Sequence, residues 1–246
     1  NPALNDLTFE KSAYKEVSWW EDSESNLMSM NGVVDKTALL LTIVTLTAIA
    51  VYLTVPISLF LSLLGAIVGF VVALIIIFSG SMNPILICTY AACQGLFLGG
   101  ITWIIEYQYN APGLGIVAAV LTFLILGVML SIYRAGLISW NKNMQIAVTS
   151  SMVAILLIYL VSFIGSFVGF EVPLIHGNGA VGIAFSVFVV GIASLCLVAD
   201  FDFIERGVER GAPKQLEWRA AFGLLVTLIW LYLEILKLLA KLAPRK

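Results

Sequence analysis

The sequence predicts an all-α, polytopic membrane protein with seven membrane-spanning helices. Hydrophobic residues make up 61% of the 246 residues and charged residues only 11%, which is too apolar for a water-soluble domain. The mean hydropathy is +1.03. The apolar residues gather in seven long runs, most of them separated by clusters of glycine, proline, asparagine and serine. Together these observations predict helices that cross a membrane and turn at the clusters.

Each run is long enough for a helix that crosses ~30 Å of hydrocarbon, which takes about 20 residues. The predicted spans are Thr37–Val55, Ile57–Ser79, Pro84–Ile105, Leu114–Ile132, Ile146–Phe170, Val181–Phe203 and Ala220–Leu242. Only Pro56 separates the first two spans. Because proline disfavours helical geometry in the residue before it, we expect a tight helical hairpin here. The later spans end at GSMNP (80–84), NAPG (110–113), SWNKN (139–143), HGNG (176–179) and GAP (211–213).

The N-terminal residues 1–35 differ from the rest, because they are acidic and contain the pair Trp19-Trp20. Tryptophan is common at membrane boundaries, so we expect a cytoplasmic or interfacial segment. A segment that docks a partner protein is the alternative. Residues 36–246 form the predicted seven-helix membrane domain.

Lysine and arginine predict the orientation, because cytoplasmic loops carry an excess of them. The side that includes the N-terminus carries Lys11, Lys15, Lys36, Arg134, Lys142, Arg206, Arg210, Lys214 and Arg219. The opposite side carries only the tail residues Lys237, Lys241, Arg245 and Lys246. We therefore expect a cytoplasmic N-terminus. The basic tail leaves open whether the last segment crosses fully or returns to the cytoplasmic side, and its length favours a full span.

The composition also excludes several classes of function. The net charge of −2 gives no broad basic surface, so no nucleic-acid partner is expected. The sequence has no nucleophile elbow, zinc-protease helix, phosphate-binding loop or Cys/His cluster. We therefore predict a membrane protein that is not an enzyme and has no resident cofactor.

Two acids stand inside the last two apolar runs, Asp200 in LCLVADFDFIERG and Glu234 in LIWLYLEILKLL. A carboxylate at membrane depth is costly unless it faces a protein interior or a water-filled cavity, so such residues mark ion or proton pathways. Asp200 shares its helix face with apolar residues. Glu234 precedes Lys237 by three residues and Lys241 by seven, so an ion pair on the helix surface is the alternative for this acid.

Asp202 is a less favoured third candidate for the ion pathway. At about 100° per residue, it points about 200° away from Asp200 around the helix. Arg206 follows it by four residues, so we expect a surface salt bridge between Asp202 and Arg206.

If Asp200 and Glu234 meet, their chemistry follows from their proximity. Two carboxylates in a poorly solvated site do not easily both ionise, so the pair holds a proton that rising pH removes. The pair would then sense pH and bind calcium transiently, because calcium is a hard cation that takes oxygen ligands. Contact becomes possible if the sixth helix continues to about Val208 and the last span begins near Phe222.

The third span contains a glycine cluster, QGLFLGG at residues 94–100. Gly95 and Gly99 are four residues apart and lie on one helix face, and Gly100 follows directly. Such small-xxx-small spacing lets helix backbones approach closely, so we expect these glycines to pack against other helices.

At these residues the sequence resembles a known family, the Bax inhibitor-1 or YccA-like membrane proteins, also called transmembrane BAX inhibitor motif proteins. The resemblance covers all seven spans and is most specific in the glycine-rich third span, at Asp200, and in LYLEIL around Glu234. The ending DFDFIERGVERGAPKQLEWRAAFGLLVTLIWLYLEILKLL resembles the bacterial branch. The sequence departs from the usual family pattern in the glutamate at the second acid, in Asp202, in Gln94 and in the lack of arginine within the first three spans.

The resemblance implies six helices around a central seventh and a pH-sensitive pair of acids, Asp200 and Glu234, that controls calcium leak. The resulting hypothesis is a calcium leak channel in the bacterial inner membrane, in contact with lipid and calcium. The alternative is an interaction protein that regulates a membrane-bound protease or another membrane complex. A transporter of another solute ranks third.

Overall fold

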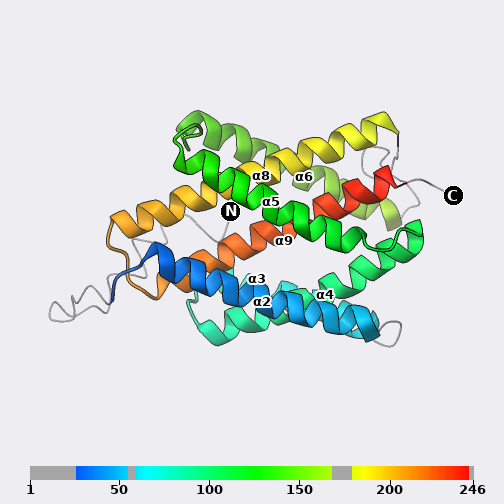
Figure 1. The fold of residues 1–246 in the computed structure, drawn as a ribbon, viewed down its shortest axis with the longest axis horizontal. Helices are drawn as coiled ribbons and strands as arrows, with labels where there is room; N and C mark the ends of the chain where they lie inside the picture. Colours follow the sequence, from blue (N-terminus) through cyan, green and yellow to red (C-terminus); the bar gives the residue numbers. More distant parts are fainter. Residues whose placement is uncertain (1–25, 55–58, 168–178, 244–246) are drawn as a thin grey trace. The chain divides into compact units, whose positions relative to one another are not determined.

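The structure is a computed structural model that describes residues 26–54, 59–167 and 179–243. These described residues contain seven helices, each long and apolar enough to cross a membrane (Figure 1). The helices are α2 (Met30–Thr54), α3 (Leu59–Ser79), α4 (Pro84–Tyr109), α5 (Leu114–Arg134), α6 (Lys142–Phe167), α8 (Ala180–Glu209) and α9 (Leu216–Leu242). The predicted all-α, seven-helix membrane fold is confirmed.

The described helix ends follow the breaker clusters of the sequence. Gly113 before α5 and Gly211 after α8 have φ angles of 90° and 63°, a left-handed conformation that favours glycine. Asn83 and Asn141 cap α4 and α6, because each side-chain oxygen accepts a hydrogen bond from a backbone N–H two or three residues on, at 2.9 Å. Local backbone chemistry therefore sets these turns.

Several helices are longer than the predicted spans. The start of α2 moves from Thr37 to Met30, the end of α8 from Phe203 to Glu209, and the start of α9 from Ala220 to Leu216. The polar residues beyond each apolar run continue the helix, so residues 30–35 of the predicted N-terminal segment form the first turns of α2. The predicted boundaries at Val55, Ile57 and Phe170, and residues 1–25, lie outside the described residues.

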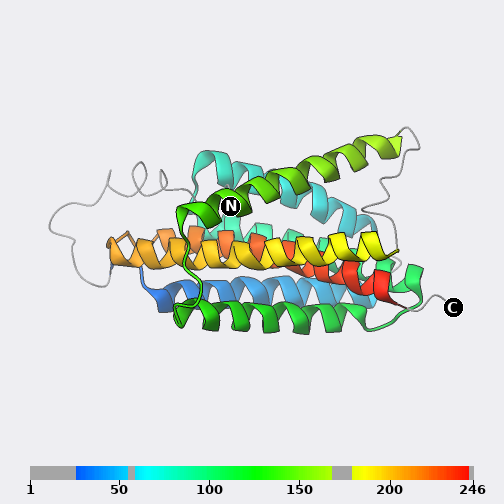
Figure 2. The same ribbon diagram turned by 90° about the horizontal axis from the view of Figure 1, so that it is seen from above.

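The chain forms two compact units. The first comprises Asn1–Ile105 and Asp200–Val226, and the second comprises Glu106–Ala199 and Thr227–Lys246. Both α8 and α9 contribute to each unit, and Figure 2 shows α8 as one unbroken helix. The division places Asp200 in the first unit and Glu234 in the second.

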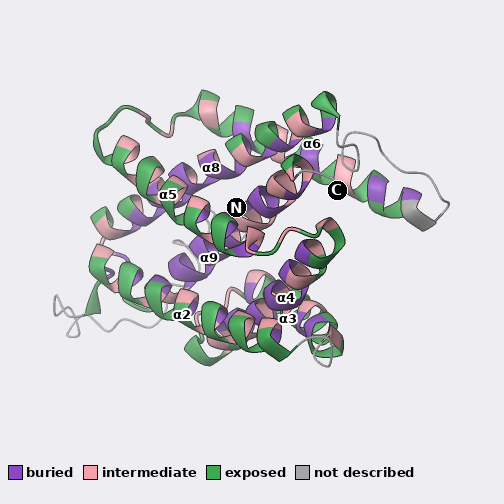
Figure 3. Ribbon diagram, turned by 45° about the vertical axis from the view of Figure 1, so that its right-hand side comes forward, coloured by how far each residue is buried: buried purple, intermediate pink, exposed green. Residues whose placement is uncertain are grey.

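Among the helices of the described chain, α9 is the most buried. In its most apolar stretch 61% of the residues are buried, compared with 17% to 44% in the other six candidate spans (Figure 3). Phe222, Leu225, Leu231 and Leu236 of α9 have no exposed surface. This burial agrees with the expectation of a central last helix.

In the first unit, two glycines bring α4 close to α2. A Cβ atom added at Gly95 would overlap the hydroxyl of Thr47, and one added at Gly99 would overlap the carbonyl oxygen of Ala48. Because both partners belong to α2, the two glycines place the backbones of α2 and α4 in close contact.

A second set of small residues brings α4 close to α3. A Cβ atom added at Gly100 would overlap the hydroxyl of Ser62, which donates a hydrogen bond to the carbonyl oxygen of Phe97 at 3.1 Å. On α3 itself, a Cβ atom added at Gly65 would lie 2.7 Å from the carbonyl oxygen of Cys93. Gly99 thus allows close contact of α4 with α2, and the next residue, Gly100, allows close contact with α3.

We predict that Gly95→Ala destabilises the protein, because its new methyl group has no room beside α2. The expected loss is about 1–3 kcal/mol in the free energy of unfolding, measured by denaturation in detergent. Gly127→Ala on α5 is the matched control, since a Cβ atom at Gly127 has no neighbour within 4 Å. Equal stability of the two variants would contradict the close contact of α2 and α4.

Candidate functional site

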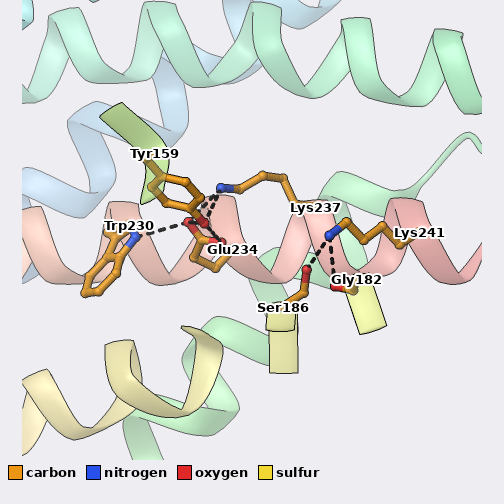
Figure 4. A network of polar contacts seen from close by, with 7 residues as sticks. All are labelled: Tyr159, Gly182, Ser186, Trp230, Glu234, Lys237 and Lys241. Atoms are coloured by element: carbon orange, nitrogen blue, oxygen red, sulfur yellow. Dashed lines mark hydrogen bonds and ion pairs between the residues drawn. The ribbon is translucent and has the colours of Figure 1, made fainter. Parts of the chain in front are cut away.

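Glu234 lies on α9 in the second unit, and only 2% of the residue is exposed. Three donors surround its carboxylate (Figure 4). The hydroxyl of Tyr159 lies 2.8 Å and 2.9 Å from the two oxygens, and the indole N–H of Trp230 and the ammonium of Lys237 donate to Oε1 at 3.1 Å and 2.7 Å. These hydrogen bonds satisfy the carboxylate and offset much of the cost of its burial.

Trp230 and Lys237, which donate to Glu234, lie on the same face of α9 as this acid. The polar stripe of α9 consists of Trp230, Glu234, Lys237 and Lys241. Steps of four, three and four residues place all members on one helix face. At the end of the stripe, Lys241 donates to the carbonyl oxygen of Gly182 at 3.0 Å and to the hydroxyl of Ser186 at 2.8 Å, both on α8 (Figure 4). The stripe therefore contacts α6 and α8 within one unit.

Lys237 contacts both Glu234 of α9 and Tyr159 of α6. Its ammonium donates to the hydroxyl oxygen of Tyr159 at 3.2 Å and lies 4.6 Å from the centroid of the same ring. The side chain of Lys237 is 39% exposed, whereas that of Glu234 is 3% exposed. The ion pair suggested by the sequence spacing is thus present, with a buried acid and a partly exposed base.

Asp200 lies on α8 in the first unit and is 1% exposed. Phe201 and Ile204 beside it on the helix are buried as well. α8 continues to Glu209, past the residue that the predicted pairing with Glu234 requires. The two acids belong to different units, and their pairing stays a prediction.

Asp202 forms an ion pair with Arg206, four residues further along α8. The side chains of Asp202 and Arg206 are 17% and 37% exposed. This is the salt bridge that the sequence spacing predicts. A pair with this exposure contributes little to stability, and it places Asp202 at the charged end of α8.

Sequence reasoning missed two further buried acids, and Glu106 is the first of them. It lies in the last turn of α4, and its carboxylate accepts a hydrogen bond from the backbone N–H of Gly115 at 2.8 Å. Gly115 stands in the first turn of α5, where unpaired N–H groups and the helix dipole favour an anion. Glu106 thus fastens the end of one helix to the start of the next.

Glu217 is the second missed acid, and it has no exposed surface. It stands in the first turn of α9, in the first unit. Its carboxylate accepts hydrogen bonds from the backbone N–H and the hydroxyl of Ser29, at 2.9 Å and 3.1 Å, and pairs with Lys36 of α2. A Cβ atom added at Gly32 would overlap this carboxylate, so α2 needs a glycine there.

Backbone pairing extends the contact around Glu217. The N–H of Met28 donates to the carbonyl oxygen of Ala212 at 2.7 Å, and the N–H of Lys214 donates to the carbonyl oxygen of Asn26 at 2.8 Å. Leu27 and Pro213 form the antiparallel bridge between these bonds. The N-terminal clasp, defined as residues 26–29 paired with residues 212–217, ties the chain before α2 to the connection between α8 and α9. Backbone pairing needs no particular side chains, so no sequence pattern predicts it.

Within the described part of the chain, no group of three or more His, Cys, Asp and Glu side chains could hold a metal ion. Glu234 supplies two oxygens, whereas bound calcium takes about six to eight oxygen ligands.

Seven long apolar helices that bury acids in their interior define a polytopic helical membrane protein. A family model described as Bax inhibitor 1 like matches residues 1–244. The chain therefore belongs to the Bax inhibitor 1 like family of integral membrane proteins. No curated protein matches the sequence significantly.

We predict that Glu217 of the N-terminal clasp and Lys36 of α2, which form an ion pair, are energetically coupled. Glu217→Gln or Lys36→Met alone should each cost about 1–3 kcal/mol in the free energy of unfolding, because each leaves a poorly solvated partner without its counter-charge. The double variant should lose less than the sum of the two. Thermal and chemical unfolding in detergent measure this cycle, and purely additive losses would refute the coupling.

Proposed function

We propose that this protein mediates a pH-sensitive leak of cations across its membrane, that calcium is the principal ion, and that Asp200 and Glu234 lie on its path. One observation carries the proposal: both acids are no more than 2% exposed, and both stand in helices apolar enough to span a membrane. Acids in such positions are costly and are retained where charge must move. Membership in the Bax inhibitor 1 like family supports the same reading.

The chemistry of carboxylates links the leak to pH. An ionised carboxylate attracts a hard cation, whereas a protonated one does not. Loss of a proton from a carboxylate on the path makes cation entry more favourable, so the leak increases toward alkaline pH. The protein uses no covalent step in this scheme and acts as a conduit and not as an enzyme.

The proposal also includes the membrane in which the protein lies and its orientation there. We place it in a bacterial inner membrane with the N-terminus in the cytoplasm. The basic residues at the ends of α5 and α8, Arg134 and Arg206 in the last turns and Arg210 directly after α8, support this orientation because the cytoplasmic side is enriched in lysine and arginine.

Calcium flux into proteoliposomes that contain the purified full chain tests the proposal. Asp200→Asn and Glu234→Gln should each lower the flux about tenfold or more and flatten its pH dependence, because each removes a charge that offsets the cost of the ion at membrane depth. The measurement is the fluorescence of a calcium indicator trapped in the vesicles.

Asp202→Asn is the matched control, since Asp202 is an acid of the same helix that pairs with Arg206 at the charged end of α8. Its flux should stay at the level of the unaltered protein. Flux that ignores pH and is equal in all variants would rule out the leak. Co-purification of a stoichiometric membrane protease in that case would favour the regulatory interaction protein instead.

A further inference from the structure

The ammonium of Lys237 occupies the position that a cation bound to Glu234 would take. It is the donor nearest to the carboxylate, at 2.7 Å from Oε1, and it also contacts the hydroxyl and the ring face of Tyr159 (Figure 4). A carboxylate, a phenol oxygen and an aromatic face are groups that attract cations. The groups that hold the ammonium of Lys237 are thus of the kind that would also attract a mobile cation.

A mobile cation cannot share this place with Lys237. Calcium bonds to carboxylate oxygens at about 2.3–2.6 Å, which is shorter than the distance of the ammonium from the same oxygen. Two positive charges on one buried oxygen repel strongly, because little water lies between them to screen the repulsion. Binding of a hard cation at Oε1 of Glu234 thus requires the ammonium to leave.

The two ends of the ion pair differ in their freedom to move. Glu234 is 3% exposed and is held by the hydroxyl of Tyr159 and the indole of Trp230, whereas Lys237 is 39% exposed. Lysine has a long flexible stem whose charged end readily turns toward water. The exposed base is therefore the movable partner, and the buried acid is the fixed one.

Lys241, one turn further along the polar stripe, has a different task. Its two hydrogen bonds go to Gly182 and Ser186 of α8. It carries the same charge as Lys237 and stands on the same helix face, yet its hydrogen bonds join it to α8 and not to the carboxylate. Replacement of Lys241 therefore removes one positive charge from this helix face without removing a hydrogen bond to Glu234, and it is the control for replacement of Lys237.

We propose that Lys237 is a tethered cation that closes Glu234 in the resting protein, and that a hard multivalent cation binds Glu234 only after this ammonium swings away. Tyr159 and Trp230 hold the carboxylate in place during the exchange. The inference rests on the proposed function for the ion's further passage, but the exchange at Glu234 is a binding event that can be measured without flux.

Terbium binding to the full chain in detergent tests the exchange, because terbium is a hard cation whose luminescence is sensitised by nearby tryptophan. Lys237→Met should bind terbium about tenfold more tightly than the unaltered protein, since the competing charge is gone. Lys237→Arg should show no gain because it keeps the charge, and Lys241→Met should show a clearly smaller gain than Lys237→Met. Lys237→Met combined with Glu234→Gln should lose the gain.

A chemical rescue keeps the test decisive if Lys237→Met folds poorly. Lys237→Cys should also gain terbium affinity, and attachment of an aminoethyl group through a disulfide should reverse the gain by restoring an ammonium. A neutral group of similar size should leave the gain in place, and the unaltered protein, with its own three cysteines, is treated in parallel. Reversal by the charged group alone supports the proposal.

The results separate this inference from the proposed function. A gain in terbium affinity that depends on Glu234, without calcium flux, would support the exchange and reject the leak. No gain in Lys237→Met or Lys237→Cys, or a gain that persists after Glu234→Gln, would overturn the exchange, even if flux depends on Asp200 and Glu234.

Discussion

The structure depends on local compensation of charge where water is scarce. A buried carboxylate costs several kcal/mol unless hydrogen bonds and opposite charge replace its water, so each such acid fixes its donors in place. Glu106 fixes the start of α5, Glu217 fixes the chain before α2, and Glu234 fixes α6. Alongside the close glycine contacts of α4, these acids provide specific connections between helices.

The same need for charge compensation ties α9 at two places, one in each compact unit. Its first turn is tied by Glu217 within the first unit, and its polar stripe is tied by Tyr159 and Ser186 within the second. Between these polar ties, Leu225 and Leu231 are fully buried. Apolar burial supplies most of the favourable free energy, and the polar ties determine how α9 is rotated about its axis within each unit.

The sequence predicted the number and type of the helices because length and hydropathy are local properties of the chain. It missed the polar extensions of α2 and α8 because hydropathy reports apolar character and not the end of a helix. In the site, the pairing of Glu234 with Lys237 was visible as a spacing of three residues. Tyr159 lies 75 residues from Glu234, and Ser29 lies 188 residues from Glu217, so no local sequence pattern predicted these partners.

Burial and transport place opposite demands on an acid such as Glu234. Burial requires a counter-charge at all times, whereas passage of a cation requires that the acid be free when the ion arrives. A fixed arginine from a neighbouring helix would meet the first demand and oppose the second. A lysine on the same helix meets both, because its backbone stays in register with the acid while its flexible stem leads toward the exposed side. The acid can then exchange one positive charge for another, while the hydrogen bonds from Tyr159 and Trp230 hold it during the interval.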